Sequence, residues 1–467
     1  MQFLQMRQEA GLIVAFILMF IADLFIPEKH RKLLHPIACV LLAAQMIITI
    51  KPYEVSLFGG MYNWTEIASV LKTILSFGTL IVFLQSTEWL ERQDARHKTG
   101  EFYILAMSTL IGMYFMISAG HFLLFFIGLE LATVPMACLV AFDKYKGNSA
   151  EAGAKFILYA LFSSGIFLYG VSLIYGAVGS LYFEDIPAHL HGCELQTLAL
   201  VFIFSGLAFK LSLVPFHLWT PDTYQGAPTA VSGMLSAISK GAAAFALMTI
   251  LFKVFGPMAD KWTHMLSIII VITITIGNLF ALRQSNMKRF MAFSSVSQAG
   301  YIVLSLLGDA TQGAASLVYY ILIYTVANLA VFGVINEIEQ KTHGKVNRDD
   351  YKGLYKTNPK LTMVMTLALF SLAGIPPFAG FFSKFFVFST AFAQGHWLVV
   401  FLALINTVIS LYYYLLVVKA MFIDENDSPV ETLDSSIYMK LSLLICLAGI
   451  LLIGVIGGTY EIVFNWS

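Results

Sequence analysis

Residues 206–241 read GLAFKLSLVPFHLWTPDTYQGAPTAVSGMLSAISKG. The stretch lies inside a strongly apolar sequence, yet it carries two lysines, Lys210 and Lys240, and three prolines. A lysine at the centre of a bilayer costs about 2.5–3.5 kcal/mol on insertion scales, and a proline breaks the hydrogen-bond ladder of a helix. Irregular backbone at membrane depth survives only where protein or water covers it. The stretch therefore indicates an ion path through protein.

The composition is that of a polytopic helical membrane protein. The chain has 467 residues, of which 58% are hydrophobic and 12% charged, whereas ordinary soluble domains contain about 25% charged residues. Apolar runs of about 20 residues recur from end to end, where a β-barrel would show alternation. The formal net charge is zero, so no basic face for nucleic acid is expected. The first apolar run, roughly residues 11–26, is followed by its basic residues and is expected to be a retained helix.

The apolar runs predict an all-α fold of about 14 transmembrane helices. Their centres fall near residues 18, 41, 76, 110, 131, 165, 206, 241, 271, 299, 324, 376, 408 and 450. A short turn at 118–120 is expected between the fourth and fifth spans. The longest polar stretch, residues 337–360, is expected to be a loop.

Basic residues gather in alternate loops of this arrangement. They are Lys29, Arg31, Lys32, Arg92, Arg96, Lys98, Lys144, Lys146, Arg283, Lys288, Arg289, Lys341, Lys345, Arg348, Lys352 and Lys356. By the positive-inside rule these loops are cytoplasmic and both termini face the outer side of the membrane. Lys51, Lys253 and Lys261 are exceptions to the pattern.

The seventh and twelfth spans resemble each other weakly. Residues 209–219, FKLSLVPFHLW, and residues 372–388, LAGIPPFAGFFSKFFVF, are both interrupted by proline and both hold one lysine. Paired, proline-interrupted helices in corresponding halves are typical of inverted-repeat transporters and mark their ion sites. Five spans separate the two, an odd number, as inversion requires.

Four ionisable residues lie deep in predicted spans and are the candidate proton carriers: Glu130, Lys210, Lys240 and Lys384. Glu130 is the only acid of its span, and it is either a structural carboxylate or an ion-pair partner for a buried lysine. A carboxylate within about 4–6 Å favours a charged lysine, whereas desolvation favours a neutral one. Moving or protonating the carboxylate would release the lysine proton, and lysine suits this role because its proton affinity shifts readily on burial.

Several other residues have two interpretations each. His217 and Asp222 follow the break and either take up protons or cap the next helix. Lys155 is a supporting charge or a snorkelling residue, and Lys72 is expected to snorkel. The polar residues of FSSVSQAGYIVL (293–304) line a hydrated channel or form interhelical hydrogen bonds.

No motif supports covalent or redox chemistry in the chain. The four cysteines, Cys39, Cys138, Cys193 and Cys446, are far apart and form no CxxC pair. The sequence contains no GxSxG elbow, P-loop or dinucleotide fingerprint. No metal or cofactor site is therefore expected.

Four quoted stretches carry a resemblance to a known family. They are GLELATVPM (128–136), FKLSLVPFHLWTPDTYQGAPTAVS (209–232), NLFALRQSNMKRFMAFSSVSQAGY (278–301) and SLAGIPPFAGFFSKFFVF (371–388). Together they resemble the antiporter-like subunits N of bacterial respiratory complex I, the counterparts of mitochondrial NADH dehydrogenase subunit 2. The resemblance covers roughly residues 100–420.

The resemblance implies a fold, a role and a set of partners. The fold is two inverted five-helix repeats with broken helices 7 and 12, which divides the chain into 1–100 (helices 1–3), 101–257 (helices 4–8), 258–425 (helices 9–13) and 426–467 (helix 14). The role is proton translocation along Glu130, Lys210, Lys240 and Lys384, driven by NADH oxidation and quinone reduction in other subunits. The implied partners are other membrane subunits of complex I, within the lipid bilayer of the bacterial inner membrane. Members often have histidine where this chain has Gln298, which can still orient water.

Three rival functions remain at this stage. One is a D-type subunit of a multisubunit sodium/proton antiporter or a membrane-bound hydrogenase subunit, which shares the lysines and the broken helices. The second, from another class, is a structural anchor whose polar axis is a relic. A quinone-binding role is the third.

Overall fold

The computed structural model describes residues 2–49, 54–92, 94–143, 146–342, 344–426, 429–456 and 458–467. Thirteen helical segments among these residues are long and apolar enough to cross a membrane. Two further apolar helices of 15 residues each, α15 (Pro359–Ala373) and α16 (Ala379–Ala393), follow one another. Each is about 23 Å long, shorter than a bilayer core of about 30 Å, so together they form one interrupted crossing. The prediction of an all-α fold with about 14 spans is confirmed.

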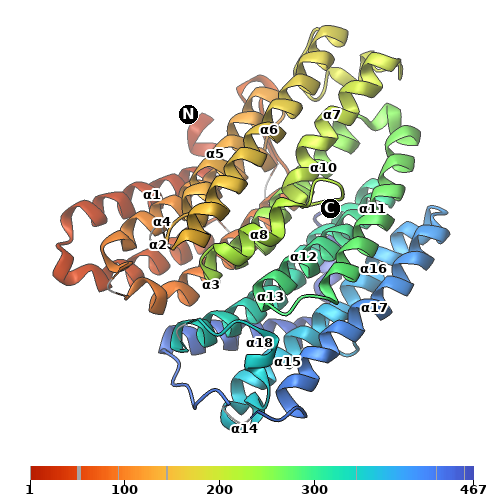
Figure 1. The fold of residues 1–467 in the computed structure, drawn as a ribbon. Helices are drawn as coiled ribbons and strands as arrows, with labels where there is room; N and C mark the ends of the chain where they lie inside the picture. Colours follow the sequence, from red (N-terminus) through yellow and green to blue (C-terminus); the bar gives the residue numbers. More distant parts are fainter. Residues whose placement is uncertain are drawn as a thin grey trace.

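The helices form one elongated bundle (Figure 1). The first half contains α1 (Arg7–Phe25), α2 (Leu34–Ile48), α3 (Glu66–Leu90), α4 (Thr99–Ile117), α5 (Phe122–Val140), α6 (Gly147–Val178), α7 (Glu194–Leu211), α8 (Trp219–Gly226), α9 (Thr229–Met234) and α10 (Lys240–Thr249). The second half contains α11 (Ala259–Ala281), α12 (Met287–Leu304), α13 (Ala310–Lys341), α14 (Leu354–Thr357), α15, α16, α17 (Trp397–Phe422), α18 (Ile437–Val455) and α19 (Gly458–Phe464). Lys51 and Lys144 lie outside the described residues.

The break in the seventh crossing is sealed by protein. Helix α7 ends at Leu211, and Ser212 follows in a left-handed conformation (φ 60°, ψ 37°). The backbone N–H of Val214 donates to the hydroxyl of Thr273 on α11 at 3.0 Å, and the indole of Trp219 donates to the carbonyl of Phe209 at 3.0 Å. Polar groups released by the break therefore find partners inside the protein, as membrane depth requires.

The break between α15 and α16 begins, like the break after α7, with a residue in the left-handed conformation. Gly374 follows α15 with φ 87° and ψ 39°. The first turn of α16 then packs directly on the end of α15, because a Cβ added at Gly380 would lie 1.7 Å from the carbonyl oxygen of Ser371. Both predicted interrupted spans therefore turn through a left-handed residue at the end of their first half.

Helices α4 and α5 approach each other closely through two glycines. A Cβ added at Gly112 would lie 2.3 Å from the backbone nitrogen of Ala132, and one at Gly128 would lie 2.5 Å from that of Met116. The turn at 118–120 joins these two helices, as predicted. This contact fixes the position of α5, which carries Glu130.

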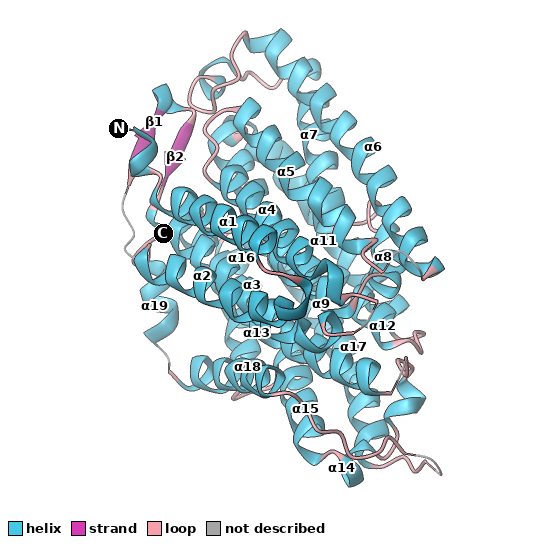
Figure 2. Cartoon of the chain, turned by 90° about the vertical axis from the view of Figure 1, so that its left-hand side faces the viewer, coloured by secondary structure: helices cyan, strands magenta, loops and turns pink. Residues whose placement is uncertain are grey.

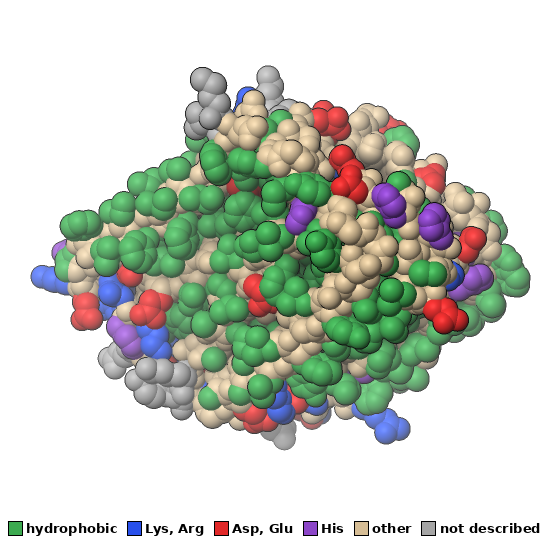
Figure 3. All heavy atoms as spheres, turned by 90° about the horizontal axis from the view of Figure 1, so that it is seen from above, with side chains coloured by type: hydrophobic (Ala, Val, Ile, Leu, Met, Phe, Trp, Pro, Cys, Tyr) green, Lys and Arg blue, Asp and Glu red, His purple; other side chains and the backbone are tan. Residues whose placement is uncertain are grey.

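A small β-hairpin lies at one edge of the bundle, near the N-terminus (Figure 2). Its strands, β1 (Val55–Leu57) and β2 (Tyr62–Trp64), pair in antiparallel fashion and were not predicted. The outer surface of the bundle is largely hydrophobic, and Figure 3 shows hydrophobic side chains over most of one face. This is the surface expected of a protein immersed in lipid and among other membrane subunits.

Helix α13 continues further than the sequence indicated. The stretch that begins at Glu337 was predicted to be a loop, but α13 runs on to Lys341. Glu337 is fully buried in this last turn. The prediction was wrong for residues 337–341. Their charged side chains suggested a loop, but neighbouring helices surround this last turn of α13. We call the end of the bundle where α13 ends, and where Arg92, Lys146 and Lys288 also lie, the basic end.

Candidate functional site

The ammonium of Lys210 binds the turn of α5 that carries Glu130. Lys210 is 9% exposed, and its ammonium donates to the hydroxyl of Thr133 and, at 3.4 Å, to the carbonyl of Leu129. The carboxylate of Glu130 accepts a hydrogen bond from Ser164 on α6. No direct ion pair joins Glu130 and Lys210 within the described residues, but the Glu130 charge is near enough to act on the lysine. The Glu130 charge therefore acts on Lys210 through space, while Thr133 and Leu129 of the same turn hold the ammonium.

Lys240 lies at the point where two kinds of helix meet. A π-helical turn, Leu235–Ser239, connects α9 to α10, and Lys240 is the first residue of α10. It is 1% exposed, and its ammonium donates to the hydroxyl of Ser295 on α12 at 2.7 Å. The ammonium also lies 5.7 Å from the ring centre of Tyr224. Among the described residues no carboxylate pairs with it, and π-helical turns are frequent at functional sites.

Lys384 binds the free end of α15. Its ammonium donates to the carbonyls of Leu372 and Ala373, each at 2.9 Å, and lies 4.9 Å from the ring centre of Tyr301. A helix C-terminus carries a partial negative charge, so these carbonyls stabilise a cation without a carboxylate. A Cβ added at Gly374 would lie 3.0 Å from Cδ of Lys384, so the glycine leaves room for this approach.

Gln298 connects the Lys384 site to its neighbours. Its amide nitrogen donates to the carbonyl of Leu372 at 3.2 Å, the acceptor that Lys384 also uses. Its amide oxygen accepts from Tyr320 at 2.5 Å, and its amide nitrogen also approaches the hydroxyl of Tyr414 at 3.4 Å. Ser295, which binds Lys240, lies one turn away on the same helix. The polar face of α12 therefore makes interhelical hydrogen bonds at both lysine sites, one of its two predicted roles.

Asp222 bridges two basic side chains. Its carboxylate lies 2.7 Å from the ammonium of Lys155 and 2.6 Å from the guanidinium of Arg289. All three side chains are about a third exposed, and Lys155 is held in this ion pair instead of snorkelling. No side chain caps α8, whose N-cap residue is Leu218, so the capping interpretation of His217 and Asp222 is wrong.

His217 is buried within reach of the Lys240 charge. It is 8% exposed, its Nδ1 makes no hydrogen bond with the described residues, and Lys240 is near enough for its charge to act on the ring. His217 is therefore buried near Lys240, whereas Asp222 is partly exposed in its ion pairs with Lys155 and Arg289.

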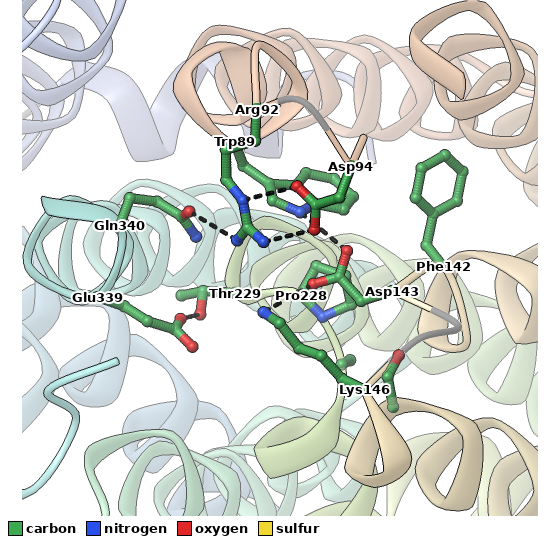
Figure 4. Close-up of polar contacts among 12 residues, drawn as sticks. Trp89, Arg92, Asp94, Phe142, Asp143, Lys146, Pro228, Thr229, Glu339 and Gln340 are labelled. Atoms are coloured by element: carbon green, nitrogen blue, oxygen red, sulfur yellow. Dashed lines mark hydrogen bonds and ion pairs between the residues drawn. The ribbon is translucent and has the colours of Figure 1, made fainter. Parts of the chain in front are cut away.

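Lys288 is buried although it was predicted as an ordinary loop charge. It is 4% exposed and donates to the carbonyl of Ala227 at 2.8 Å, with the carboxylate of Glu339 at 3.5 Å. Thr229 donates to the same carboxylate, as Figure 4 shows. A polar cavity of about 290 Å³ opens here at the basic end. Lys146, Gln225, Thr229, Lys288 and Glu339 are among its lining residues.

Sequence reasoning missed a second buried pair, Glu9 with Lys72. The two side chains are fully buried, and the ammonium lies 2.5 Å from the carboxylate. Tyr62 donates to the same carboxylate at 2.7 Å, and Lys72 also donates to Ser118. The prediction that Lys72 snorkels is wrong, because the hairpin and the turn before α5 close over it. Glu9 lies at the start of the first helix and Lys72 in the third, so nothing in the sequence indicated that the two would pair.

The described residues contain no group of three or more histidine, cysteine, aspartate or glutamate side chains that could hold a metal ion. All four cysteines are free thiols. The ammonium groups of Lys210, Lys240 and Lys384 are buried next to broken or π-helical backbone. Hydroxyl and carbonyl oxygens hold them. Such groups can gain and lose protons without a covalent step.

Comparisons with known proteins show which family the chain resembles. The family described as NADH:quinone oxidoreductase/Mrp antiporter, TM, matches residues 119–410. NADH-quinone oxidoreductase subunit N of Phocaeicola vulgatus is 70% identical over 459 residues, which cover 98% of this chain and 97% of that protein. The subunit N of Desulforamulus reducens is 34% identical over 466 residues, covering 98% and 96% of the two chains.

Solved structures give the same result for the fold. A chain of respiratory complex I from Thermus thermophilus with bound aureothin superposes with a TM-score of 0.82 at 30% identity, covering 97% of this chain and 98% of that one. A chain of the Mrp complex from Dietzia superposes with a TM-score of 0.87 at 19% identity, covering 99% and 96%. The second likeness concerns the fold alone.

Proposed function

The chain belongs to the NADH:quinone oxidoreductase/Mrp antiporter transmembrane family, and we propose that Glu130, Lys210, Lys240 and Lys384 are the residues through which it moves protons. It is an antiporter-like membrane subunit, homologous to subunit N of respiratory NADH-quinone oxidoreductase. Lys155, His217, Asp222 and Gln298 support the path.

The observation that carries the proposal is the environment of the three lysines. Each is at most 9% exposed, and none forms a direct ion pair within the described residues. An ammonium held only by hydroxyls and carbonyls loses its proton more easily than one held by a carboxylate. Proton transfer from Lys240 toward Lys384 follows the polar face of α12, through Ser295 and Gln298.

The proposed orientation places the basic end on the cytoplasmic side and both termini on the outer side of a bacterial inner membrane. Protons enter from the basic end near His217 and Lys240 and leave near Lys384. The division into residues 1–100, 101–257, 258–425 and 426–467, with the two central units as inverted repeats, belongs to the same proposal. The left-handed turns at Ser212 and Gly374 support it.

The redox chemistry is proposed to lie in other subunits of the complex. The related proteins are named NADH-quinone oxidoreductase subunits, so NADH and quinone are the reactants of the assembled complex. In this chain no flavin, iron–sulfur or quinone site is proposed. Its partners are the neighbouring membrane subunits and the lipid.

One alternative is sodium transport, because the Mrp-type fold is shared. Purified complex in proteoliposomes distinguishes the two when proton and sodium uptake are followed during quinone reduction. Lys240→Met is expected to abolish proton uptake in the assembled complex. Lys419→Met is the control, since Lys419 is half-exposed beside Asp424 and outside the path. Sodium uptake that survives a protonophore, or proton uptake at wild-type rate in Lys240→Met, would contradict the proposal.

A further inference from the structure

Lys384 is held differently from the other two lysines of the proposed path. Lys210 and Lys240 each donate to a side-chain hydroxyl. Among the described residues, Lys384 donates only to backbone carbonyls, those of Leu372 and Ala373. An ammonium has three N–H donors, so two carbonyls leave part of its charge without an acceptor. A further group is therefore needed to stabilise this buried charge.

The ring of Tyr301 on α12 supplies that group. The ammonium of Lys384 lies over this ring, 4.9 Å from its centre, and Tyr301 is fully buried. The face of an aromatic ring carries partial negative charge, so it stabilises a cation, most strongly where water is excluded. Lys240 also lies over a tyrosine ring, that of Tyr224, but at 5.7 Å and in addition to its hydroxyl acceptor. At Lys384 the ring takes the place of that hydroxyl.

The hydroxyl of Tyr301 is engaged with α17. It donates to the carbonyl of Ala403 at 3.3 Å, and the hydroxyl of Thr407 lies 3.2 Å from it. The ring itself contacts Phe388, one turn after Lys384 on α16, with ring centres 6.1 Å apart. The hydroxyl therefore anchors the ring to α17, and the face of the ring meets the lysine.

The other titratable side chains around Lys384 are also tyrosines. Tyr320 and Tyr324 on α13 line a small cavity beside the lysine, together with Gln298 and Ser383. No carboxylate or second ammonium of any described residue is near enough to act on Lys384. The contact with the Tyr301 ring is therefore not masked by a stronger ionic one.

We propose that Tyr301 is a positioning residue for proton transfer, whose ring face holds the protonated Lys384 against the free end of α15. A ring face stabilises the cation but cannot take its proton, because it has no lone pair to offer. Tyr301 thus favours the charged lysine without becoming a step of the path itself. This inference rests on the proposed function, since it assumes that Lys384 carries protons.

The first test is the pH profile of proton pumping by the assembled complex, in vesicles with the same pH on both sides. Tyr301→Leu removes the ring face and is expected to move the alkaline half-point of pumping down by about one pH unit, a tenfold change in proton binding. The shift has this sign because the ring stabilises only the charged lysine. Tyr301→Phe keeps the ring, so its half-point should stay near that of wild type. An unshifted profile in Tyr301→Leu, or equal shifts in both variants, would overturn the proposal.

A graded series keeps the test decisive where Tyr301→Leu fails to assemble. Phenylalanine analogues with one, two or three ring fluorines are introduced at position 301 by suppression of a stop codon. Fluorine changes the shape of the ring little but withdraws negative charge from its face, which weakens its attraction for a cation. The alkaline half-point should fall with each added fluorine. A ring that serves only for packing predicts one profile for the whole series, and that result would refute the positioning role.

Two further variants complete the test. Tyr319→Leu is the matched control, because this buried ring packs on the rings of Phe386 on α16 and Tyr460 instead of on a lysine. Its half-point should match that of wild type, and a shift as large as that of Tyr301→Leu would contradict the proposal. If Lys384→Met loses pumping while the fluorinated series keeps the wild-type profile, the role of Tyr301 is wrong and the lysine path stands. If Lys384→Met pumps at the wild-type rate, the proposed function itself fails.

Discussion

The Glu9–Lys72 pair gives a quantitative prediction about stability. Both side chains are fully buried and the two charged atoms are 2.5 Å apart. At an effective dielectric constant of about 20 their attraction is about 7 kcal/mol, most of which offsets the desolvation of two ions. Lys72→Met leaves the Glu9 carboxylate buried, with Tyr62 as its remaining strong donor. Removing one partner of such a pair costs roughly 3–5 kcal/mol.

The double variant Glu9→Gln with Lys72→Met should recover most of that loss. The double variant leaves no unpaired charge in the core, so the cost of roughly 3–5 kcal/mol for an uncompensated buried charge is absent. The amide oxygen introduced by Glu9→Gln can still accept the hydrogen bond from Tyr62. The assay is the temperature at which half of the subunit is lost from the solubilised complex, read on native gels for wild type, both single variants and the double variant. A large loss in each single variant and recovery in the double variant are expected. If Lys72→Met alone were as stable as wild type, the pair would not be the closed ionic contact described above.

Two further predictions concern packing and the α12 network. Gly112→Ala should reduce assembly, at a cost of about 1–3 kcal/mol or more, because its Cβ would lie 2.3 Å from a backbone atom of α5. Gly165→Ala is the matched control, since nothing lies within 4 Å of its Cβ, and an equal effect of both would refute the packing argument. Gln298→Leu should slow proton uptake and destabilise the complex by about 1–3 kcal/mol, because it leaves the hydroxyl of Tyr320 without its partner. Gln284→Leu, just after the end of α11, is its control, and normal pumping in Gln298→Leu would show that α12 does not connect the two lysines.

The sequence predicted the elements that depend on local chemistry. A lysine next to a proline in an apolar run is visible without a structure, so the burial of Lys210 and the interruptions after Leu211 and Ala373 could be anticipated. The burial of Lys240 and Lys384 follows from the same reasoning, because both lie far from the ends of their spans. The number of spans follows from hydropathy alone.

Contacts between side chains of different helices could not be predicted from local sequence chemistry. Lys72 is six residues into its helix, where snorkelling is the ordinary outcome, and its partner Glu9 is 63 positions away. Glu337 looked like a loop residue because charge usually marks the end of a span, yet its surroundings come from α3 and the segment before α18. Periodicity shows which face of a helix is polar, but not which other helix that face meets.

The partners of Asp222 could not be predicted from the sequence for the same reason. Its position after the break was visible, but its two basic partners come from α6 and α12, which converge only in the folded chain. A pair of exposed ion contacts contributes little to stability, about 0–1 kcal/mol. In the proposed path Asp222 acts by holding α8 against α6 and α12 at the basic end.

Proton pumping and quinone reduction in membranes that carry Lys210→Ala, with assembly checked on a native gel, test whether Lys210 carries protons. Lys210 is buried, bound to Thr133 and within reach of the Glu130 charge. If Lys210 is part of the proton path, both activities fall while the complex remains assembled. Wild-type values for both would contradict it, and the chain would then be a structural anchor.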